Sequence, residues 1–157
     1  MKPLTVLNTR EIKELNKELE ERFGFSVPKS FVFVVAGDNK INLTTRAIEQ
    51  LNIAALRMAR LGMYFCTKDK YGVRLSIEGS QLFKDTISKN IINITPEQER
   101  LWLFGKDLEL SPEQIKDTTE GISVVRCGED LCGCGRIRQG NILQNFVPKE
   151  RRTGTIE

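Results

Sequence analysis

Histidine is absent from this sequence of 157 residues. The histidine side chain titrates near neutral pH, and it is the most frequent general acid or base in enzyme sites. Its absence excludes the arrangements in which a histidine activates a serine or cysteine nucleophile. The acidic residues of the chain follow the pattern of solvated helix faces rather than of catalytic carboxylate pairs. We therefore predict that the chain is not an enzyme by itself.

Long apolar runs and phosphate-binding glycine loops are also missing. No stretch approaches the roughly 18 apolar residues of a membrane span, and no secretory signal follows Met1. These absences predict a cytoplasmic protein without membrane association. No G-x-x-x-x-G-K-[ST] segment occurs, and the glycines that flank Cys134 lack the third glycine and the helix of a dinucleotide-binding loop. We predict no cofactor.

Four cysteines are present, and three of them form a C-x4-C-x-C segment. Four thiolates can close a zinc site, but structural zinc ligands usually come as two close pairs. A disulfide is disfavoured in a reducing compartment. Residues 132 and 134 of one strand should face the same side, which favours packed thiols. Zinc, a disulfide and unligated thiols all remain open for Cys66, Cys127, Cys132 and Cys134, and no metal ligand is assigned.

Positive charge is concentrated near the end of the chain. The net charge is only +3, and basic and acidic residues balance before residue 136. Beyond that point, five basic residues stand against Glu150 and Glu157: Arg136, Arg138, Lys149, Arg151 and Arg152. A basic segment on a neutral body is typical of phosphate recognition. The alternative is a charged segment that is simply solvated.

The first half of the chain predicts a mixture of helices and strands. Asn8 and Glu11 form a capping box before apolar residues at helical spacing, and Gly24 marks the helix end. The apolar run 31–35 predicts a buried strand. The further predictions are a hairpin partner at 40–43, a short helix from Thr44 or Thr45 through Leu51, two strands between 54 and 67, a strand at 71–75 and a helix at 76–83.

The second half is predicted to be mostly strands. Thr95 followed by Pro96 and Gln98 is a strong helix start, and Gly105 ends that helix. Strands are predicted at 91–94, 122–126, 131–137 and 142–147, and a short helical turn follows Ser111. Trp102 lies beside other apolar residues of the predicted helix, which favours a core position over an exposed stacking platform.

Several segments of the second half resemble PUA domains, which bind RNA. Residues 101–108 are similar to the opening helix-glycine-strand element, and residues 122–125 to a hydrophobic strand of that domain. Residues 130–136 resemble its glycine-rich hairpin. Residues 145–152, with the letters NFVPKERR, resemble the ending of the PUA-like tails on RNA cytosine-5 methyltransferases of the NOL1/NOP2/Sun type.

Upstream, residues 31–83 resemble the pre-PUA domain of archaeal and eukaryotic ribosome-biogenesis factors, most clearly at 71–77, YGVRLSI. The resemblance implies an α+β fold. An N-terminal α/β pre-PUA-like domain would span 1–86, a small β-barrel PUA-type domain 87–152, and a flexible tail 153–157. The catalytic domain of the methyltransferases has no counterpart among these segments.

The function implied by this resemblance is recognition of structured ribosomal or transfer RNA, in ribosome biogenesis or RNA modification. Arginine and lysine would contact phosphates, and glycines would allow close approach of the RNA backbone. The implied RNA contacts are Arg74, Gly133, Gly135, Arg136, Arg138, Lys149, Arg151 and Arg152, and Arg57 and Arg60 would extend them. For Arg57, Arg60 and Arg74 the alternative is an exposed strand edge that is protected by charge. The partner would be an RNA-modifying enzyme or a pre-ribosomal particle. Alternatives are an accessory subunit of a separately encoded RNA cytosine-5 methyltransferase and a protein-interaction scaffold.

Overall fold

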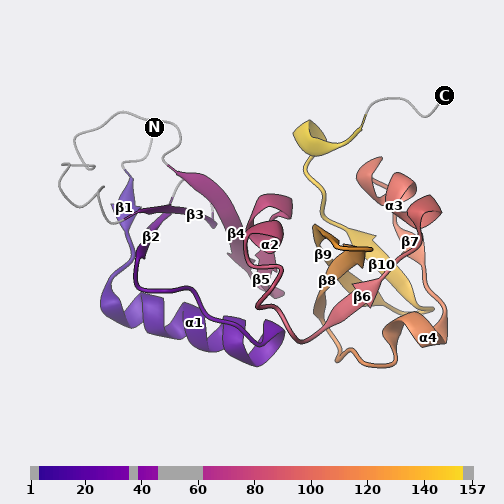
Figure 1. Ribbon diagram of the computed structural model, residues 1–157, viewed down its shortest axis with the longest axis horizontal. Coiled ribbons are helices and arrows are strands. Elements are labelled where there is room, and N and C mark those ends of the chain that lie inside the picture. The colour runs from indigo at the N-terminus through magenta and orange to yellow at the C-terminus, as the bar shows by residue number, and fades with distance from the viewer. Residues whose placement is uncertain (1–3, 36–38, 46–61, 154–157) are drawn as a thin grey trace.

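A computed structural model describes residues 4–35, 39–45 and 62–153, which form two five-stranded sheets with helices packed against them (Figure 1). The first sheet has the order β1-β2-β3-β4-β5, with every neighbouring pair antiparallel. Its strands are β1 (Thr5–Val6), β2 (Phe31–Val35), β3 (Lys40–Thr45), β4 (Met63–Asp69) and β5 (Gly72–Leu75). The helices of this half are α1 (Thr9–Phe23) and α2 (Ile77–Leu82).

Helix α1 begins and ends as its sequence predicts. The Asn8 side chain accepts a hydrogen bond from the Glu11 backbone N–H at 2.9 Å, and the Glu11 carboxylate accepts one from the Asn8 N–H at 3.0 Å. Gly24 takes a left-handed conformation, with φ of 75°, and ends the helix. The apolar stripe of α1 is buried, so this helix covers one face of the first sheet.

The strands of the first sheet agree with the sequence at most positions. The predicted strands at 31–35 and 71–75 are confirmed, the latter one residue shorter. Strand β3 continues through Thr44 and Thr45, so these residues extend the hairpin. The predicted helix through Leu51 and the first of the two strands between 54 and 67 lie outside the described residues.

The second sheet has the order β6-β8-β9-β10-β7 and curls into a half-barrel. Strand β6 runs parallel to β8, and the other neighbours are antiparallel. The elements of this half are β6 (Ile91–Asn93), α3 (Pro96–Leu103), β7 (Leu108–Glu109), α4 (Pro112–Ile115), β8 (Ile122–Cys127), β9 (Asp130–Arg138), β10 (Ile142–Asn145) and the 3-10 helix η3 (Lys149–Arg151). The predicted α+β fold class is confirmed.

Strand β9 contains a bulge at Gly133. Cys134 pairs with Val124 and Leu131 with Arg126, so two residues of β9 lie opposite one residue of β8. Gly133 has φ of 80°, a conformation that favours glycine. The bulge reverses the alternation of side chains, so Cys132 and Cys134 belong to different hydrophobic cores. The prediction that these two thiols face the same side is therefore wrong.

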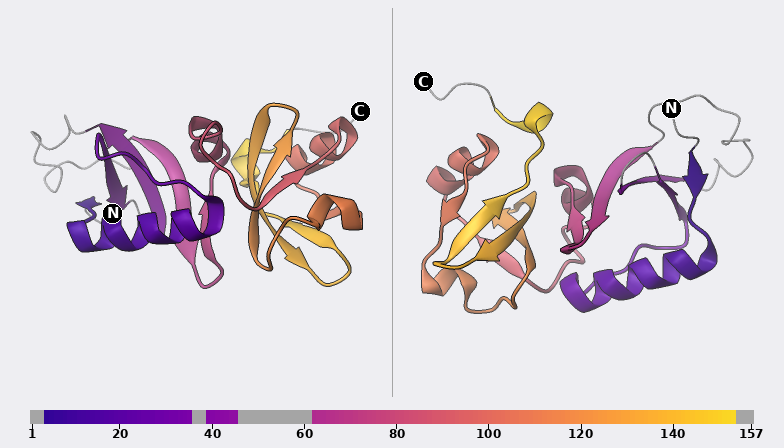
Figure 2. Two further views of the ribbon diagram at one scale, coloured as in Figure 1. Left: turned by 60° about the horizontal axis from the view of Figure 1, so that its bottom comes forward. Right: turned by 180° about the vertical axis from the view of Figure 1, so that it is seen from behind.

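The two sheets are joined by a shared hydrophobic core. The larger core contains residues of α1 and the first sheet together with residues of β8 and β9, among them Ile122, Val124 and Cys134. The smaller core lies within the half-barrel around Trp102, which is fully buried and donates a hydrogen bond to the Cys132 carbonyl at 2.9 Å. The predicted core position of Trp102 is confirmed. Helix α2 lies between the sheets in all views (Figures 1 and 2).

Hydrogen bonds also connect the two halves of the molecule near the point where the chain passes from the first sheet to the half-barrel. Arg22 donates to the carbonyls of Thr119, Glu120 and Ile122 at 3.1, 2.8 and 2.5 Å, and to the Thr119 hydroxyl at 2.8 Å. Asn90 donates to the Arg22 carbonyl at 2.6 Å and accepts from the Thr119 N–H at 2.8 Å. We call Arg22, Asn90 and Thr119 the linker seam. The division of the chain at residues 86 and 87 stays a prediction.

Candidate functional site

Two arginine–aromatic pairs connect the first sheet to the half-barrel on an accessible surface. The guanidinium carbon of Arg136, on β9, lies 4.4 Å from the ring centre of Tyr71, at the β4–β5 turn. The guanidinium carbon of Arg74, on β5, lies 4.2 Å from the ring centre of Phe146, which follows β10. Both distances are within the range of cation–π attraction. We call Tyr71, Arg74, Arg136 and Phe146 the junction surface.

The basic residues predicted to bind RNA differ in how far acidic neighbours neutralise them. Arg74 forms an ion pair with Asp69, and Arg151 forms one with Glu78 at 2.7 Å. The Arg138 guanidinium lies 4.0 Å from the Asp107 carboxylate, and both side chains are about half exposed, a geometry that contributes little energy.

Arg136 and Lys149, in contrast, form no ion pair within the part of the chain that the structure describes. Lys149 is exposed, and Arg136 is partly exposed beside its aromatic partner. These two charges are therefore available to an anionic ligand. Arg57 and Arg60 lie outside the described residues.

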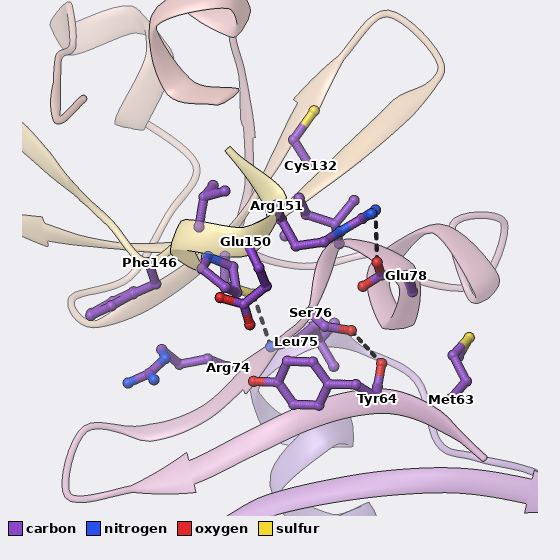
Figure 3. Close-up of a pocket in the computed structure, with 15 residues that line it drawn as sticks. Met63, Tyr64, Arg74, Leu75, Ser76, Glu78, Cys132, Phe146, Glu150 and Arg151 are labelled. Carbon is purple, nitrogen blue, oxygen red and sulfur yellow. Dashed lines mark hydrogen bonds and ion pairs between the residues drawn. The ribbon is translucent and has the colours of Figure 1, made fainter. Parts of the chain in front are cut away.

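A cavity of about 220 Å³ lies between the two halves, next to the junction surface (Figure 3). Strands β4 and β5 and the start of α2 form one side, and β9 with residues 146–151 forms the other. Tyr64 and Phe146 contribute aromatic rings, and Glu150 points from the C-terminal segment toward Tyr64 and Leu75. Burial raises the pKa of Tyr64, so its phenol remains a neutral hydroxyl. The cavity thus combines aromatic walls with charged groups.

The C-terminal segment is held in place by hydrogen bonds to α3 and to itself. Asn145 donates to the carbonyls of Trp102 and Lys106 at 2.7 and 2.9 Å, and the Thr153 N–H donates to the Leu103 carbonyl at 2.9 Å. Arg152 donates to the Val147 carbonyl at 3.1 Å. Its guanidinium covers Gly105, where a Cβ atom would lie only 2.5 Å from Nε. These contacts give Arg152 a clear structural role.

Gly133 and Gly135 are buried, and at Gly135 protein atoms occupy the space that the missing side chain leaves. The Gly133 N–H donates to the Ser80 hydroxyl at 3.1 Å. A Cβ atom on Gly135 would lie 2.7 Å from side-chain carbons of Leu143 and Trp102. Because both glycines serve packing between protein elements, we leave them out of the proposed RNA contacts.

The cysteine thiols are protonated at neutral pH. Burial raises the pKa of Cys134 and Cys132 to about 12, with Glu99 adding to the effect at Cys132, and burial also raises the pKa of Cys66. Burial and Glu99 raise the pKa of Cys127 as well. The four described cysteines form no disulfide. No group of three or more metal-ligating side chains occurs within the described ranges.

Several residues of this region were not predicted from the sequence. Tyr71 and Phe146 lie inside the motifs that carry the resemblance but had no predicted role. Tyr64 and Glu78 had none either, and Glu150 entered the prediction only as an acid among the basic residues. Their proximity depends on how β4–β5, α2 and the C-terminal segment meet, which no local spacing reveals. The exposure of Tyr71, at 40%, is a signal that only the structure supplies.

The fold and the comparisons together define a protein with a PUA-type domain. Residues 89–153 match the family model of the methyltransferase RsmF PUA domain, which confirms the resemblance found in the sequence. This match covers nearly the whole half-barrel from β6 through η3. Within the described residues, no helix has the length and apolar character needed to cross a bilayer.

Relatives named ribosomal RNA small subunit methyltransferase F match almost the whole chain. The protein of Vibrio parahaemolyticus is 26% identical over 150 residues, and that of Aeromonas hydrophila is 29% identical over 148 residues. Both alignments cover 94% of this chain but only 30% and 29% of the respective relatives. The match therefore includes the first sheet as well as the half-barrel, and the chain spans less than a third of these relatives.

A solved structure shares the fold. A hypothetical protein from the hyperthermophilic archaeon Pyrococcus horikoshii OT3 aligns with a TM-score of 0.56 and 11% identity, over 88% of this chain and 83% of that one. At this identity the likeness concerns the fold alone. A similar arrangement of helices and strands therefore makes up most of another protein chain.

Proposed function

We propose that this protein binds structured ribosomal or transfer RNA through its PUA-type domain, as a cytoplasmic component of RNA modification, and that it has no catalytic activity of its own. The match of residues 89–153 to a methyltransferase PUA domain is the observation that carries this proposal. The names of the relatives favour ribosomal RNA. The matched part is a PUA domain, which favours a role in RNA binding.

The junction surface and the exposed Lys149 together support a physical mechanism for RNA binding. Arg136 and Lys149 have no acidic partner among the described residues, so phosphate oxygens can neutralise them without breaking an ion pair. Tyr71 and Phe146 place aromatic rings beside arginine side chains. Unpaired RNA bases stack on such rings and on guanidinium planes. Charge would supply affinity, and the rings would favour unpaired or loop nucleotides.

A methyltransferase is the protein partner that the relatives favour. The relatives carry more than two thirds of their length outside the matched part. We propose that the present chain delivers or holds RNA for such an enzyme. Copurification of a methyltransferase with the chain would support this role, and copurification of pre-ribosomal particles alone would support a biogenesis factor instead.

The test is RNA binding across a salt series with two matched double variants. Arg136→Ala/Lys149→Ala removes two positive charges without breaking an ion pair of the described structure. Lys13→Ala/Lys17→Ala removes two charges from exposed positions of α1 that are not among the four residues of the junction surface. The probe is purified small-subunit ribosomal RNA, with transfer RNA in parallel.

The proposal predicts binding that weakens as salt increases. Each lost phosphate contact should lower the slope of log K against log salt by about 0.7–0.9. The Arg136/Lys149 variant should therefore bind about tenfold more weakly and with a shallower slope, while the α1 variant behaves like wild type. Equal weakening in both variants would mean that net charge alone drives binding. No binding at low salt would contradict the proposal and favour a protein-interaction scaffold.

A further inference from the structure

The cavity between the two halves extends the junction surface inward, because Arg74 and Phe146 belong to both. Its volume, about 220 Å³, is below the roughly 300–1,000 Å³ typical of pockets for drug-sized ligands. It is thus suited to one small planar ring system. Both halves of the molecule contribute to it, so it exists only when the two sheets are packed together.

Two arginines at this cavity offer guanidinium donors to a phosphate, next to the carboxylates of Glu78 and Glu150. Arg74 and Arg151 both line it, and Arg136 lies nearby through its contact with Tyr71, at the turn that precedes Arg74. Arg151 is held by Glu78 at 2.7 Å and Arg74 by Asp69, so the positions of both guanidinium groups are defined. A phosphate at the mouth of the cavity could accept from either group while a ring attached to it enters.

Glu150 gives the cavity a hydrogen-bond acceptor. Its carboxylate is directed over the cavity, as Figure 3 shows, and it forms no ion pair or hydrogen bond within the described residues. A carboxylate accepts hydrogen bonds and cannot donate them when ionised. It therefore suits a base that carries an amino group, such as cytosine, adenine or guanine. Uracil lacks an amino group and offers only its N3–H, which lies between two carbonyl acceptors.

We propose that this cavity binds one unpaired nucleotide of the RNA, with an amino-bearing base beside Tyr64 and Phe146, its amino group donating to Glu150, and its phosphate at Arg74 and Arg151. This inference rests on the proposed RNA binding and adds a base preference to it. The aromatic walls would favour a base that has left its helical stack. The protein would thus recognise a single-stranded or bulged position next to the structured RNA.

Short homopolymer oligonucleotides test the base preference directly. Six-nucleotide ribo-C, ribo-A and ribo-U strands carry the same phosphates and differ only in the base. Wild type should bind ribo-C and ribo-A about tenfold more tightly than ribo-U, since one good polar contact to a base gives roughly this discrimination. The variant Glu150→Gln should lose most of this difference, because its amide both donates and accepts.

The control variant is Glu129→Gln, an equal change of charge at an exposed residue of the β8–β9 turn. It corrects for the general gain in RNA affinity when an acid is removed, and it should keep the preference for ribo-C and ribo-A. Equal binding of all three strands by wild type would overturn the cavity proposal, as would a preference that Glu150→Gln leaves intact. If ribosomal RNA still binds with salt dependence in that case, the proposed function stands without this site.

Discussion

Arg22 and Arg136 both bridge the two halves of the molecule, but they are held in different ways. Arg22 uses its guanidinium N–H groups on four oxygens of the segment before and at the start of β8. Arg136 lies against the ring of Tyr71 and has no acidic partner among the described residues. The hydrogen bonds of Arg22 stabilise the fold, whereas the charge of Arg136 remains available to a ligand.

The comparison shows how a binding surface can be recognised next to a structural interface. In the linker seam, three backbone carbonyls and one hydroxyl accept hydrogen bonds from Arg22, so its donors are largely occupied. At Arg136 on the junction surface, the contact is made through the face of the Tyr71 ring, which positions the arginine without neutralising it. We therefore expect mutations in the linker seam to change stability and mutations on the junction surface to change RNA affinity.

The largest effect is expected for Arg22→Ala. The change removes four hydrogen bonds from a charged donor and leaves the part-buried Ile122 carbonyl without its partner, which should lower the free energy of unfolding by about 1–3 kcal/mol. Urea denaturation measures this loss. Arg22→Lys should lose most of the same stability, because an ammonium group cannot reproduce the fork of donors.

The same variant sharpens the comparison when RNA binding is measured at low temperature, where it remains folded. Its affinity should match that of Lys13→Ala, which also removes one positive charge from α1. A much larger loss of affinity in folded Arg22→Ala would show that the linker seam takes part in RNA binding, contrary to our account.

An intermediate effect on the free energy of unfolding is expected at alkaline pH. It arises from the thiol of Cys134, which lies in the core that the two halves share. Burial raises the pKa of Cys134 to about 12, while an unfolded thiol titrates near about 8.5. The folded state therefore holds its proton more tightly, and the resulting stability is fully present below about pH 8.5 and is lost as pH rises toward 12. The loss is about 1.4 kcal/mol per pH unit for each such thiol.

Urea unfolding between pH 8.5 and 10.5 isolates the contribution of Cys134. Cys134→Ala should be less stable than wild type at pH 7.5 because it leaves a small cavity. Its stability should then fall less steeply with pH, by about the slope of one thiol. Parallel pH profiles for the two proteins would mean that Cys134 does not titrate between the folded and unfolded states as described.

The smallest effect on stability is expected for Tyr71→Ala. The Tyr71 ring is 40% exposed and contacts Arg136, and an exposed cation–π contact contributes about 0.5–1 kcal/mol. RNA affinity should fall by about fivefold or more, since stacking of a base on an aromatic ring contributes about 1–3 kcal/mol. Tyr71→Phe keeps the ring and should bind RNA like wild type.

The sequence predicted local elements well and their meeting points poorly. Helix α1 and the start of α3 follow from capping residues and helical spacing, which act within a few positions of the chain. The bulge at Gly133 was missed because it depends on how β9 pairs with β8, and it placed Cys132 and Cys134 in different cores. A glycine inside a strand is typical of such a bulge, but it does not show which side chains the bulge turns to the opposite face.

The candidate site was predicted as a list of charges rather than as a surface. The sequence identified the basic residues near the end of the chain by their charge. In the structure, Arg152 covers Gly105, Arg151 forms an ion pair with Glu78, and Arg136 lies against the ring of Tyr71. Each of these partners lies at least 40 residues away in the sequence. Long-range contacts of this kind follow from tertiary packing, so spacing along the chain could not distinguish structural arginines from available ones.

Photochemical crosslinking to RNA containing 4-thiouridine, followed by mass spectrometry of the attached peptides, tests the central claim most directly. The account predicts crosslinks to the peptides that carry Tyr71 and Phe146, and their loss in Arg136→Ala/Lys149→Ala. Peptides that carry Arg22 or Thr119 should remain free of crosslinks. Crosslinks confined to the linker seam, or distributed evenly over both regions, would contradict the assignment of RNA binding to the junction surface.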